Sequence, residues 1–339
     1  MISRKKRINA FISLGKFLSD PQNAEYSQEL SIAAHRKNNW FTPENTLESL
    51  AAIAEKFLSE EKLTAWVNQY PESGSSLKIG VIMAGNIPAV GFHDVLCVLI
   101  SGHILLAKPS SDDPVLIPRL LEKLVEIEPE FASYIFFVDR LNDSDAYIAT
   151  GSDNTARYFH YYFSKKPNII RKNRTSLAVI SGNETNEELF ALGKDMLQYY
   201  GLGCRNVSKL FIPKGYDFTK FFEAIQSLDH LYLNHHKYFN NYEYNKSILL
   251  VNRTEHYDNG FLMLTESTAP VSPISVVHYE TYENIETVQE YLNLNAEKIQ
   301  CVVSHDNLIP AAVPFGKTQQ PGLSDYADEV DTMAFLAGF

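Results

Sequence analysis

The sequence predicts an α/β protein in which helices cover both faces of a parallel β-sheet. Apolar strands recur along the first half of the chain, each followed by a short turn and a helical pattern. The strands are continuous apolar runs, which is typical of strands buried on both faces of a parallel sheet. At 339 residues the chain also exceeds what one hydrophobic core usually serves. We therefore expect two domains with a cleft between them.

The predicted elements begin with a helical segment of about 70 residues. Apolar residues recur at helical spacing over residues 8–18 and again over 46–67. The first strand, 77–84, stops at a glycine, and an apolar helix over 89–100 begins directly after a proline. This strand, turn and helix form the first unit of the predicted sheet.

The same pattern continues along the chain. Further strands are predicted at 103–108, 134–138, 145–149, 176–181 and 207–212, with helices at 114–126 and 186–199. Ligands of such sheets bind at the carboxyl ends of the strands, so the turns that follow the strands are the places to search for binding residues. We place the change of domain near residue 190.

Charge and apolar patterning exclude several classes of protein. The formal net charge is 30 − 41 = −11, which opposes a large interface with a nucleic-acid backbone. Three scattered cysteines are too few for a disulfide framework or a Cys-rich zinc site, which favours a reducing cytoplasm. The basic start is not followed by an unbroken apolar block, and no run of about 18 apolar residues occurs. We expect a soluble cytoplasmic protein without a signal peptide or integral membrane segment.

Cys204 is the cysteine whose surroundings suit a nucleophile. It follows the Gly-Leu-Gly segment 201–203 and precedes Arg205. Glycines let a substrate approach the backbone closely, and exposed N–H groups with a neighbouring guanidinium favour the thiolate form. Cys97 and Cys301 lie in apolar runs and are expected in the core, because buried cysteines behave as small hydrophobic side chains.

Four segments in order resemble the aldehyde dehydrogenase superfamily. Residues 200–209, Tyr-Gly-Leu-Gly-Cys-Arg-Asn-Val-Ser-Lys, resemble its nucleophile segment, in which a Gly-x-x-Cys turn presents the catalytic thiol. Residues 84–88, Ala-Gly-Asn-Ile-Pro, are similar to its Asn-x-Pro oxyanion segment. Residues 101–110 resemble its cofactor-ribose segment, and residues 150–152, Thr-Gly-Ser, its Gly-Ser turn. The combination is specific although each segment is short.

Within the superfamily, the short chain and residues 83–94 and 201–209 most resemble the LuxC-type fatty acyl-CoA reductases, over about residues 8–336. The resemblance implies an aldehyde dehydrogenase-like α/β fold with two lobes. Each lobe would be built on a largely parallel sheet with flanking helices, with an active-site cleft between the lobes. No long oligomerisation hairpin is evident before Lys78, so the assembly of larger aldehyde dehydrogenases is not implied.

The resemblance also assigns roles to domains and residues. Residues 1–190, with 313–339 returning to them, would form the cofactor-binding domain, and 191–312 the catalytic domain. Cys204 would be the nucleophile, with Asn86 as a donor to the oxyanion. The cofactor-binding residues would be Lys108, Ser110, Gly151, Ser152 and Glu266.

The expected activity is reduction of a fatty acyl-CoA to a fatty aldehyde and CoA through a thioester on Cys204. Lys108 could pair with a 2′-phosphate, which favours NADPH as the cofactor, with NADH as the alternative. An aldehyde-oxidising relative needs a carboxylate to activate water, yet no acidic residue occurs between Asn154 and Gly182. An acyl-CoA reductase has no use for that base, because hydrolysis would waste the intermediate.

Two other functions stay open at this point. An acyltransferase-like component would accept acyl groups on Cys204 from an acyl-carrier thioester and pass them on, without binding a cofactor. A non-catalytic binding module would retain the fold, and its Cys204 would show no unusual reactivity. A homodimer or a complex with an acyl-transfer protein is compatible with each function.

Several residues allow both a structural and a functional interpretation. The stretch 165–174 holds five basic residues and is either a solvated loop or a patch facing the phosphates of CoA or the cofactor. Glu266 is either an exposed loop acid or the acid that holds the nicotinamide ribose. His235 or His236 could donate a proton near the thiol or belong to a structural region, and we expect no metal site there. The aromatic residues that could line an acyl tunnel or pack in the core are Phe92, Tyr199, Tyr200 and Phe261.

Overall fold

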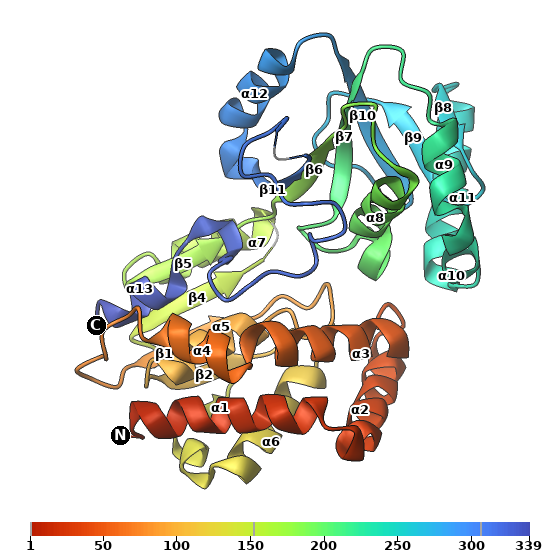
Figure 1. Cartoon of the computed structure of the whole chain (residues 1–339). Helices are drawn as coiled ribbons and strands as arrows, with labels where there is room; N and C mark the ends of the chain where they lie inside the picture. The colour runs from red at the N-terminus through yellow and green to blue at the C-terminus, as the bar shows by residue number, and fades with distance from the viewer. Residues whose placement is uncertain (1, 152, 306) are drawn as a thin grey trace. The chain divides into compact units, whose positions relative to one another are not determined.

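The computed structural model describes residues 2–151, 153–305 and 307–339, and it divides into two compact units (Figure 1). Unit 1 comprises Met1–Asn173 and Pro321–Phe339, and unit 2 comprises Arg174–Gln320. Each unit contains one β-sheet flanked by helices, with five strands in the first sheet and six in the second. The prediction of an α/β fold with two lobes on largely parallel sheets is confirmed.

Sheet A of unit 1 has the strand order β3-β2-β1-β4-β5, and all of its pairs are parallel. Its strands are β1 (Lys78–Ile82), β2 (Ile104–Lys108), β3 (Ile135–Phe137), β4 (Ala146–Thr150) and β5 (Asn168–Arg171). The order reverses at β1, because β2 and β4 lie on either side of it. Ligands of doubly wound sheets bind at the carboxyl ends of strands at such a reversal.

The helices of unit 1 include the predicted helical segment that precedes the sheet. They are α1 (Arg4–Ser19), α2 (Ala24–Lys37), α3 (Pro43–Ala52), α4 (Glu60–Val67), α5 (Phe92–Ile100), α6 (Leu116–Ile127), α7 (Asp153–Phe163) and α13 (Thr332–Ala337). The single helix expected over 46–67 is interrupted, because α3 passes into a π-helical turn, Ile53–Phe57, that ends at Leu58. Ser59 then caps α4 by accepting a hydrogen bond from the Lys62 N–H.

The core of unit 1 is centred on α5, which packs on β1 and β2. Every residue of α5 except His93 is buried, as expected of a helix that is apolar on all sides. The carboxyl-terminal segment of unit 1 closes this core. The Trp66 indole donates to the Tyr326 hydroxyl at 2.9 Å, and the His103 ring contacts the Leu336 carbonyl at 3.0 Å.

Sheet B of unit 2 has the order β11-β6-β7-β10-β9-β8 and is parallel except for the edge pair β8 and β9. Its strands are β6 (Thr175–Val179), β7 (Val207–Pro213), β8 (His256–Asp258), β9 (Met263–Glu266), β10 (Val276–Tyr282) and β11 (Ile299–Val303). Residues 174–190 and 313–320 lie in unit 2, whereas the sequence placed both ranges with the first domain. The strand β6 belongs there because it pairs with β7 and β11.

The helices of unit 2 are α8 (Asn186–Leu197), α9 (Thr219–Ile225), α10 (Asp229–Leu233), α11 (His236–Val251) and α12 (Ile285–Leu294). Figure 1 shows α12 on the opposite side of sheet B from α8 and α9. A capping box begins α8, in which Thr185 accepts from the Glu188 N–H and Glu188 accepts from the Thr185 N–H. The capping box thereby fixes the residue at which α8 begins.

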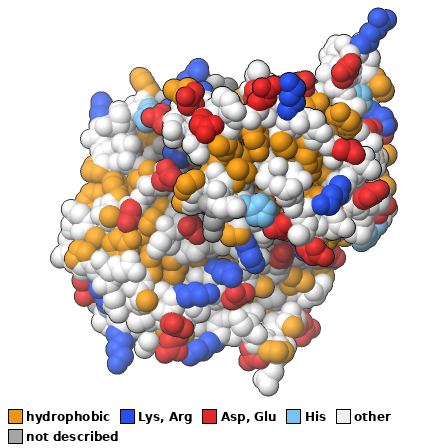
Figure 2. Space-filling view, turned by 45° about the horizontal axis from the view of Figure 1, so that its top comes forward, with side chains coloured by type: hydrophobic (Ala, Val, Ile, Leu, Met, Phe, Trp, Pro, Cys, Tyr) orange, Lys and Arg blue, Asp and Glu red, His pale blue; other side chains and the backbone are white. Residues whose placement is uncertain are grey.

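The surface carries charges of both signs. On the face seen in Figure 2, acidic and basic side chains are interspersed, with apolar side chains between them. Among the residues that the structure describes, no helix has both the length and the apolar character needed to span a membrane.

Candidate active site

Cys204 lies at an exposed corner of a tight turn at the amino-terminal edge of sheet B. The turn, residues 203–206, is closed by a hydrogen bond from the Asn206 N–H to the Gly203 carbonyl at 3.0 Å, and β7 begins at the next residue. From the neighbouring strand β6, the Ser176 hydroxyl donates to the Cys204 carbonyl at 3.0 Å. The turn is therefore tied to the sheet while the cysteine stays accessible to a substrate.

The side chain of Asn206 holds this turn against the end of α8. Its amide nitrogen donates to the carbonyls of Asp195 at 3.0 Å and Gln198 at 2.9 Å, and it lies 3.4 Å from that of Met196. Its amide oxygen accepts from the Gly203 N–H at 2.8 Å. The last carbonyls of a helix lack hydrogen-bond partners within the helix. The buried Asn206 amide binds these carbonyls and also orients the turn.

The backbone leading to the turn has an unusual conformation. Tyr199, Tyr200 and Gly201 all have positive φ angles, of 52°, 61° and 75°. For residues other than glycine, the left-handed backbone conformation costs about 1–2 kcal/mol. Strain of this kind accumulates at functional sites when the surroundings enforce it.

Aromatic packing enforces the conformation of Tyr200. Its ring stacks on His235 with centroids 4.0 Å apart, and Tyr232 and Tyr238 lie at 5.7 and 5.9 Å. His235 caps α11, because its Nδ1 accepts the Tyr238 N–H at 3.2 Å. These contacts support the structural interpretation of His235, and His236 is exposed on the first turn of α11.

A third connection ties the Cys204 turn to residues 316–318. The buried Asp195 carboxylate accepts from the Gly316 N–H at 2.6 Å and from the Thr318 N–H and hydroxyl at 3.1 and 2.8 Å. Burial raises the pKa of Asp195, although these hydrogen bonds act in the opposite direction. Arg205 donates from Nε to the Thr318 carbonyl at 2.6 Å. The guanidinium proposed to favour the thiolate is thus also engaged in holding this segment.

The other two cysteines have different environments. Cys97 is fully buried in α5, and burial raises the pKa of its thiol well above the ordinary value. It is the core residue that the sequence predicts. Cys301 is partly exposed in β11, and its sulfur lies 3.1 Å from the Ser176 hydroxyl, so it is less buried than expected.

Glu266 is the exposed last residue of β9, and the segment after it runs back toward β7. Lys209, fully buried in β7, donates to the carbonyls of Ser267 at 3.1 Å and Thr268 at 3.0 Å and pairs with the Glu280 carboxylate. The Ser208 hydroxyl donates to the Pro270 carbonyl at 3.0 Å. Unit 2 thus connects the segment after Glu266 to the strand that follows Cys204.

In unit 1, Asn86 is exposed in the turn between β1 and α5. The turn requires a positive φ of 54° at Ala89, whose N–H donates to the buried Asp113 carboxylate at 2.9 Å. A Cβ on Gly85 would lie 2.6 Å from the Ser110 side chain, so only glycine permits this approach. The Asn86 turn and Ser110 therefore lie side by side at the carboxyl edge of sheet A.

The other predicted cofactor residues follow neighbouring strands of sheet A. Lys108 is the exposed last residue of β2, and Gly151 follows β4. A Cβ on Gly151 would lie 3.0 Å from Thr155 and Phe159, so a glycine here lets α7 pack closely against the end of β4. Ser152 lies outside the described residues.

Sequence reasoning did not find Asn206, Asp195 or Lys209. Asn206 and Lys209 lie within the nucleophile segment, and Lys209 carried one signal, since a charged residue in an apolar strand needs a buried partner. The partners of Asn206 and Asp195 are mostly backbone groups of other segments. No residue pattern in the sequence reveals those contacts.

The basic stretch 165–174 does not form one exposed patch. Arg171 is buried, pairs with Asp94 of α5 at 2.6 Å, and donates to the Thr332 hydroxyl at 2.8 Å. Burial alone would lower the pKa of Arg171, but the adjacent Asp94 carboxylate holds it above the ordinary value. Arg171 is therefore a structural residue, and the phosphate-facing interpretation is wrong for it.

The four aromatic residues considered for an acyl tunnel are buried. Phe92 is 1% exposed in α5 within the core of unit 1, and Phe261 is 1% exposed in unit 2. Among the described residues, no group of three or more His, Cys, Asp or Glu side chains is arranged to hold a metal ion.

The family of the chain follows from its match to a family model. The model described as acyl-CoA reductase (LuxC) matches residues 21–242, which is more than half of the sequence. The chain belongs to the LuxC family of acyl-CoA reductases. It is accordingly an oxidoreductase-type enzyme with an aldehyde dehydrogenase-like fold. A search of curated proteins gave no significant sequence match.

Solved aldehyde dehydrogenases have the same fold as this LuxC family member. The aldehyde dehydrogenase KauB from Pseudomonas aeruginosa is 13% identical, with a TM-score of 0.62 over 89% of this chain and 72% of that one. The NAD+ complex of aldehyde dehydrogenase from Bacillus cereus is 14% identical, with a TM-score of 0.59 over 89% and 72%. An acetylating aldehyde dehydrogenase from Geobacillus thermoglucosidasius is 9% identical, with a TM-score of 0.63 over 96% and 84%.

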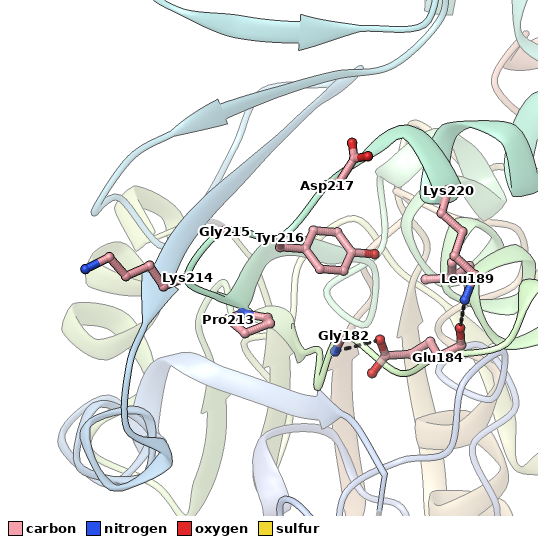
Figure 3. A pocket seen from close by; sticks show the side chains of 9 residues that line it. All are labelled: Gly182, Glu184, Leu189, Pro213, Lys214, Gly215, Tyr216, Asp217 and Lys220. Carbon is pink, nitrogen blue, oxygen red and sulfur yellow. Dashed lines mark hydrogen bonds between the residues drawn. The ribbon is translucent and has the colours of Figure 1, made fainter.

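A pocket of about 430 Å³ lies at the opposite end of sheet B from Cys204, where β6 and β7 end (Figure 3). The Glu184 carboxylate is buried beside this pocket and accepts from the N–H groups of Ser181 at 2.7 Å and Gly182 at 3.0 Å. Lys220 donates to the Glu184 carbonyl. The amide groups that could receive an anion at this strand end therefore already bind a carboxylate of the chain itself.

Proposed function

We propose that this LuxC family member reduces an acyl-CoA thioester to an aldehyde and CoA through a thioester on Cys204, with a fatty acyl group as the substrate and NADPH as the reductant. The observation that carries the proposal is the exposed Cys204 on a turn fixed by Asn206 and Ser176. Buried structural cysteines are inert, whereas catalytic ones lie exposed in polar surroundings.

The acyl-transfer step uses groups of the chain itself. The Cys204 thiolate forms a bond to the acyl carbonyl carbon, and the bond from that carbon to the CoA sulfur breaks. CoA leaves as a thiolate, which takes a proton from solvent. The Cys204 N–H and the Asn86 amide are the proposed donors to the oxyanion of the tetrahedral intermediate, and one such donor typically contributes about 10²- to 10³-fold to turnover.

Residues of unit 1 fit a dinucleotide at the carboxyl edge of sheet A. Lys108 ends β2, Ser110 follows β2 and Gly151 follows β4, and these strands lie on either side of the reversal at β1. The corresponding edge of sheet B is less suitable, because Glu184 already occupies the amide groups after β6. We propose that Lys108 pairs with the cofactor phosphate and Glu266 with the nicotinamide ribose. The cofactor, when bound, supplies the hydride that converts the thioester to the aldehyde.

The absence of an acidic residue between Asn154 and Gly182 supports reduction over aldehyde oxidation. The resemblance places Ile170 or a nearby residue of β5 where the base would be, and the next residue, Arg171, has a guanidinium that pairs with Asp94. A guanidinium cannot accept a proton from water at neutral pH. The acyl group on Cys204 is therefore preserved for reduction.

The test is aldehyde formation from a panel of acyl-CoAs with NADPH and with NADH. Wild-type protein should form aldehyde, and Cys204→Ser should form neither aldehyde nor a covalent acyl adduct while remaining folded. Cys97→Ser and Cys301→Ser should retain turnover. Acylation of Cys204 without cofactor-dependent aldehyde would favour the acyltransferase alternative. An acyl adduct on another residue would contradict the assignment of Cys204.

A further inference from the structure

One backbone hydrogen bond and one side-chain hydrogen bond fix the peptide groups on the two sides of Cys204. The Gly203–Cys204 peptide is held by the bond from the Asn206 N–H to the Gly203 carbonyl, at 3.0 Å. The Cys204–Arg205 peptide is held by the Ser176 hydroxyl on the Cys204 carbonyl, also at 3.0 Å. Fixing both peptides fixes φ and ψ of Cys204, and hence the direction in which its Cβ points.

The hydrogen bond to the Gly203 carbonyl determines the direction of the Cys204 N–H. In a trans peptide the N–H and C=O groups point in opposite directions, and the chain has no cis bonds among the described residues. Since the Gly203 carbonyl is directed at the Asn206 N–H, the Cys204 N–H is directed away from Asn206. The oxyanion donor of the proposed reaction is therefore oriented by the geometry of residue 206.

The side-chain amide of Asn206 maintains that geometry. Its oxygen accepts the Gly203 N–H at 2.8 Å, and its nitrogen donates to carbonyls at the end of α8. The preceding residues Tyr199 and Tyr200 are in left-handed conformations, which favour rearrangement if released. Without the amide, the turn loses its direct hydrogen bonds to the end of α8 and keeps the indirect link from Arg205 through Thr318 to Asp195. The turn then has more freedom to move.

We infer that Asn206 and Ser176 are positioning residues that fix the thiol and the N–H of Cys204 for attack on a thioester. The inference deepens the proposed function and rests on it for the role of the N–H. A shift of about 1 Å in reacting groups can cost about 100-fold in rate. Loss of the Asn206 side chain should therefore reduce turnover strongly, while substrate affinity changes little.

The experiment compares Asn206→Ala and Ser176→Ala with the matched control Asn245→Ala. Asn245 is also a buried asparagine of unit 2, and its amide donates to the Ile274 carbonyl at 3.0 Å, in a helix that does not carry the cysteine turn. For each folded variant we would measure kcat and KM for acyl-CoA reduction. A second measurement is the pH profile of Cys204 alkylation by iodoacetamide, with the adduct located by peptide mass spectrometry.

Asn206→Ala should lower kcat about 10- to 100-fold with KM within about twofold, and should shift the alkylation profile. Ser176→Ala should lower kcat about 3- to 10-fold, and Asn245→Ala should remain within about twofold in both measurements. Folded Asn206→Ala with wild-type kcat, or an equal loss in Asn245→Ala, would overturn the inference. If Asn206→Ala does not fold, an unchanged kcat and alkylation profile in Ser176→Ala overturns it. If wild-type protein does not reduce acyl-CoA, the proposed function fails, and the alkylation profiles alone decide whether Asn206 positions the thiol.

Discussion

Breaking the buried pair between Arg171 and Asp94 should destabilise unit 1 by a large fraction of its stability. The two side chains are 4% and 10% exposed, and their charged atoms are 2.6 Å apart. Asp94→Ala leaves the Arg171 guanidinium buried without its carboxylate, which typically costs about 3–5 kcal/mol. A domain is commonly stable by only about 5–15 kcal/mol, so this loss should be plain in an unfolding curve.

The two tryptophans make the measurement specific to one unit. Trp40 and Trp66 both belong to unit 1, so tryptophan fluorescence during urea unfolding follows that unit. The double variant Arg171→Met/Asp94→Leu should recover most of the stability, because apolar replacement of a buried pair is often neutral. Lys172→Ala, at an exposed neighbouring position, should change the free energy of unfolding by less than about 0.5 kcal/mol.

Two outcomes would refute the reasoning. If Asp94→Ala cost less than about 1 kcal/mol, the pair would not be the buried connection that its geometry indicates. If Lys172→Ala cost as much as Asp94→Ala, the loss would reflect the basic stretch as a whole. A structural role for Arg171 requires that the single variant be much less stable than both the double variant and the control.

The remaining predictions concern reactivity and the second unit. Asn86→Ala should lower turnover about 100- to 1,000-fold with little change in acyl-CoA binding, and a loss below about threefold in steady-state kinetics would exclude an oxyanion role. Burial raises the pKa of the Cys97 thiol, so this thiol stays protonated at pH 8. Iodoacetamide should therefore modify Cys204 in native protein and Cys97 only after denaturation. Peptide mapping that finds Cys97 modified first would contradict this. Acyl-enzyme formed without cofactor should resist hydrolysis yet return acyl-CoA when CoA is added, and rapid release of labelled fatty acid would reveal an unidentified base. Lys209→Met should cost about 1–3 kcal/mol in urea unfolding followed by circular dichroism, because Glu280 and two carbonyls lose their donor; an unchanged curve would argue against that buried connection.

Sheet A was predictable because its signals are local. Each strand is an apolar run that ends in a turn, and the all-parallel pairing follows from repeated strand, turn and helix. The interruption at Leu58 was not predictable from the same pattern, because apolar spacing continues through it. Gly15 explains it in part, since a Cβ there would lie 2.6 Å from Leu58, so α1 and this turn are in close contact.

The sequence indicates candidate site residues whose chemistry depends on their own residue type. It does not indicate residues whose role depends on hydrogen-bond or ion-pair partners far away in the sequence. Cys204 stands out by its neighbours in the sequence and is exposed in the structure, and its role as the nucleophile stays a prediction. Arg171 appeared to belong to a basic surface because the charged run is visible in the sequence, whereas its partner Asp94 lies 77 positions earlier. The left-handed conformations of Tyr199 and Tyr200 have no sequence signal, because glycine is the residue that such angles favour.

The interleaving of the two units has a consequence for vectorial synthesis on the ribosome. Unit 2 is inserted between residues 173 and 321 of unit 1. The hydrogen bonds that Tyr326 makes with Trp66, and Thr332 with Arg171, therefore cannot form until all of unit 2 has been translated. Unit 2 has all of its residues first and can fold as a block, since domains generally fold as units during synthesis. Until α13 has been translated, the surface of α5 that it covers stays exposed. Exposed apolar surface of this kind is what chaperones bind in incompletely folded chains.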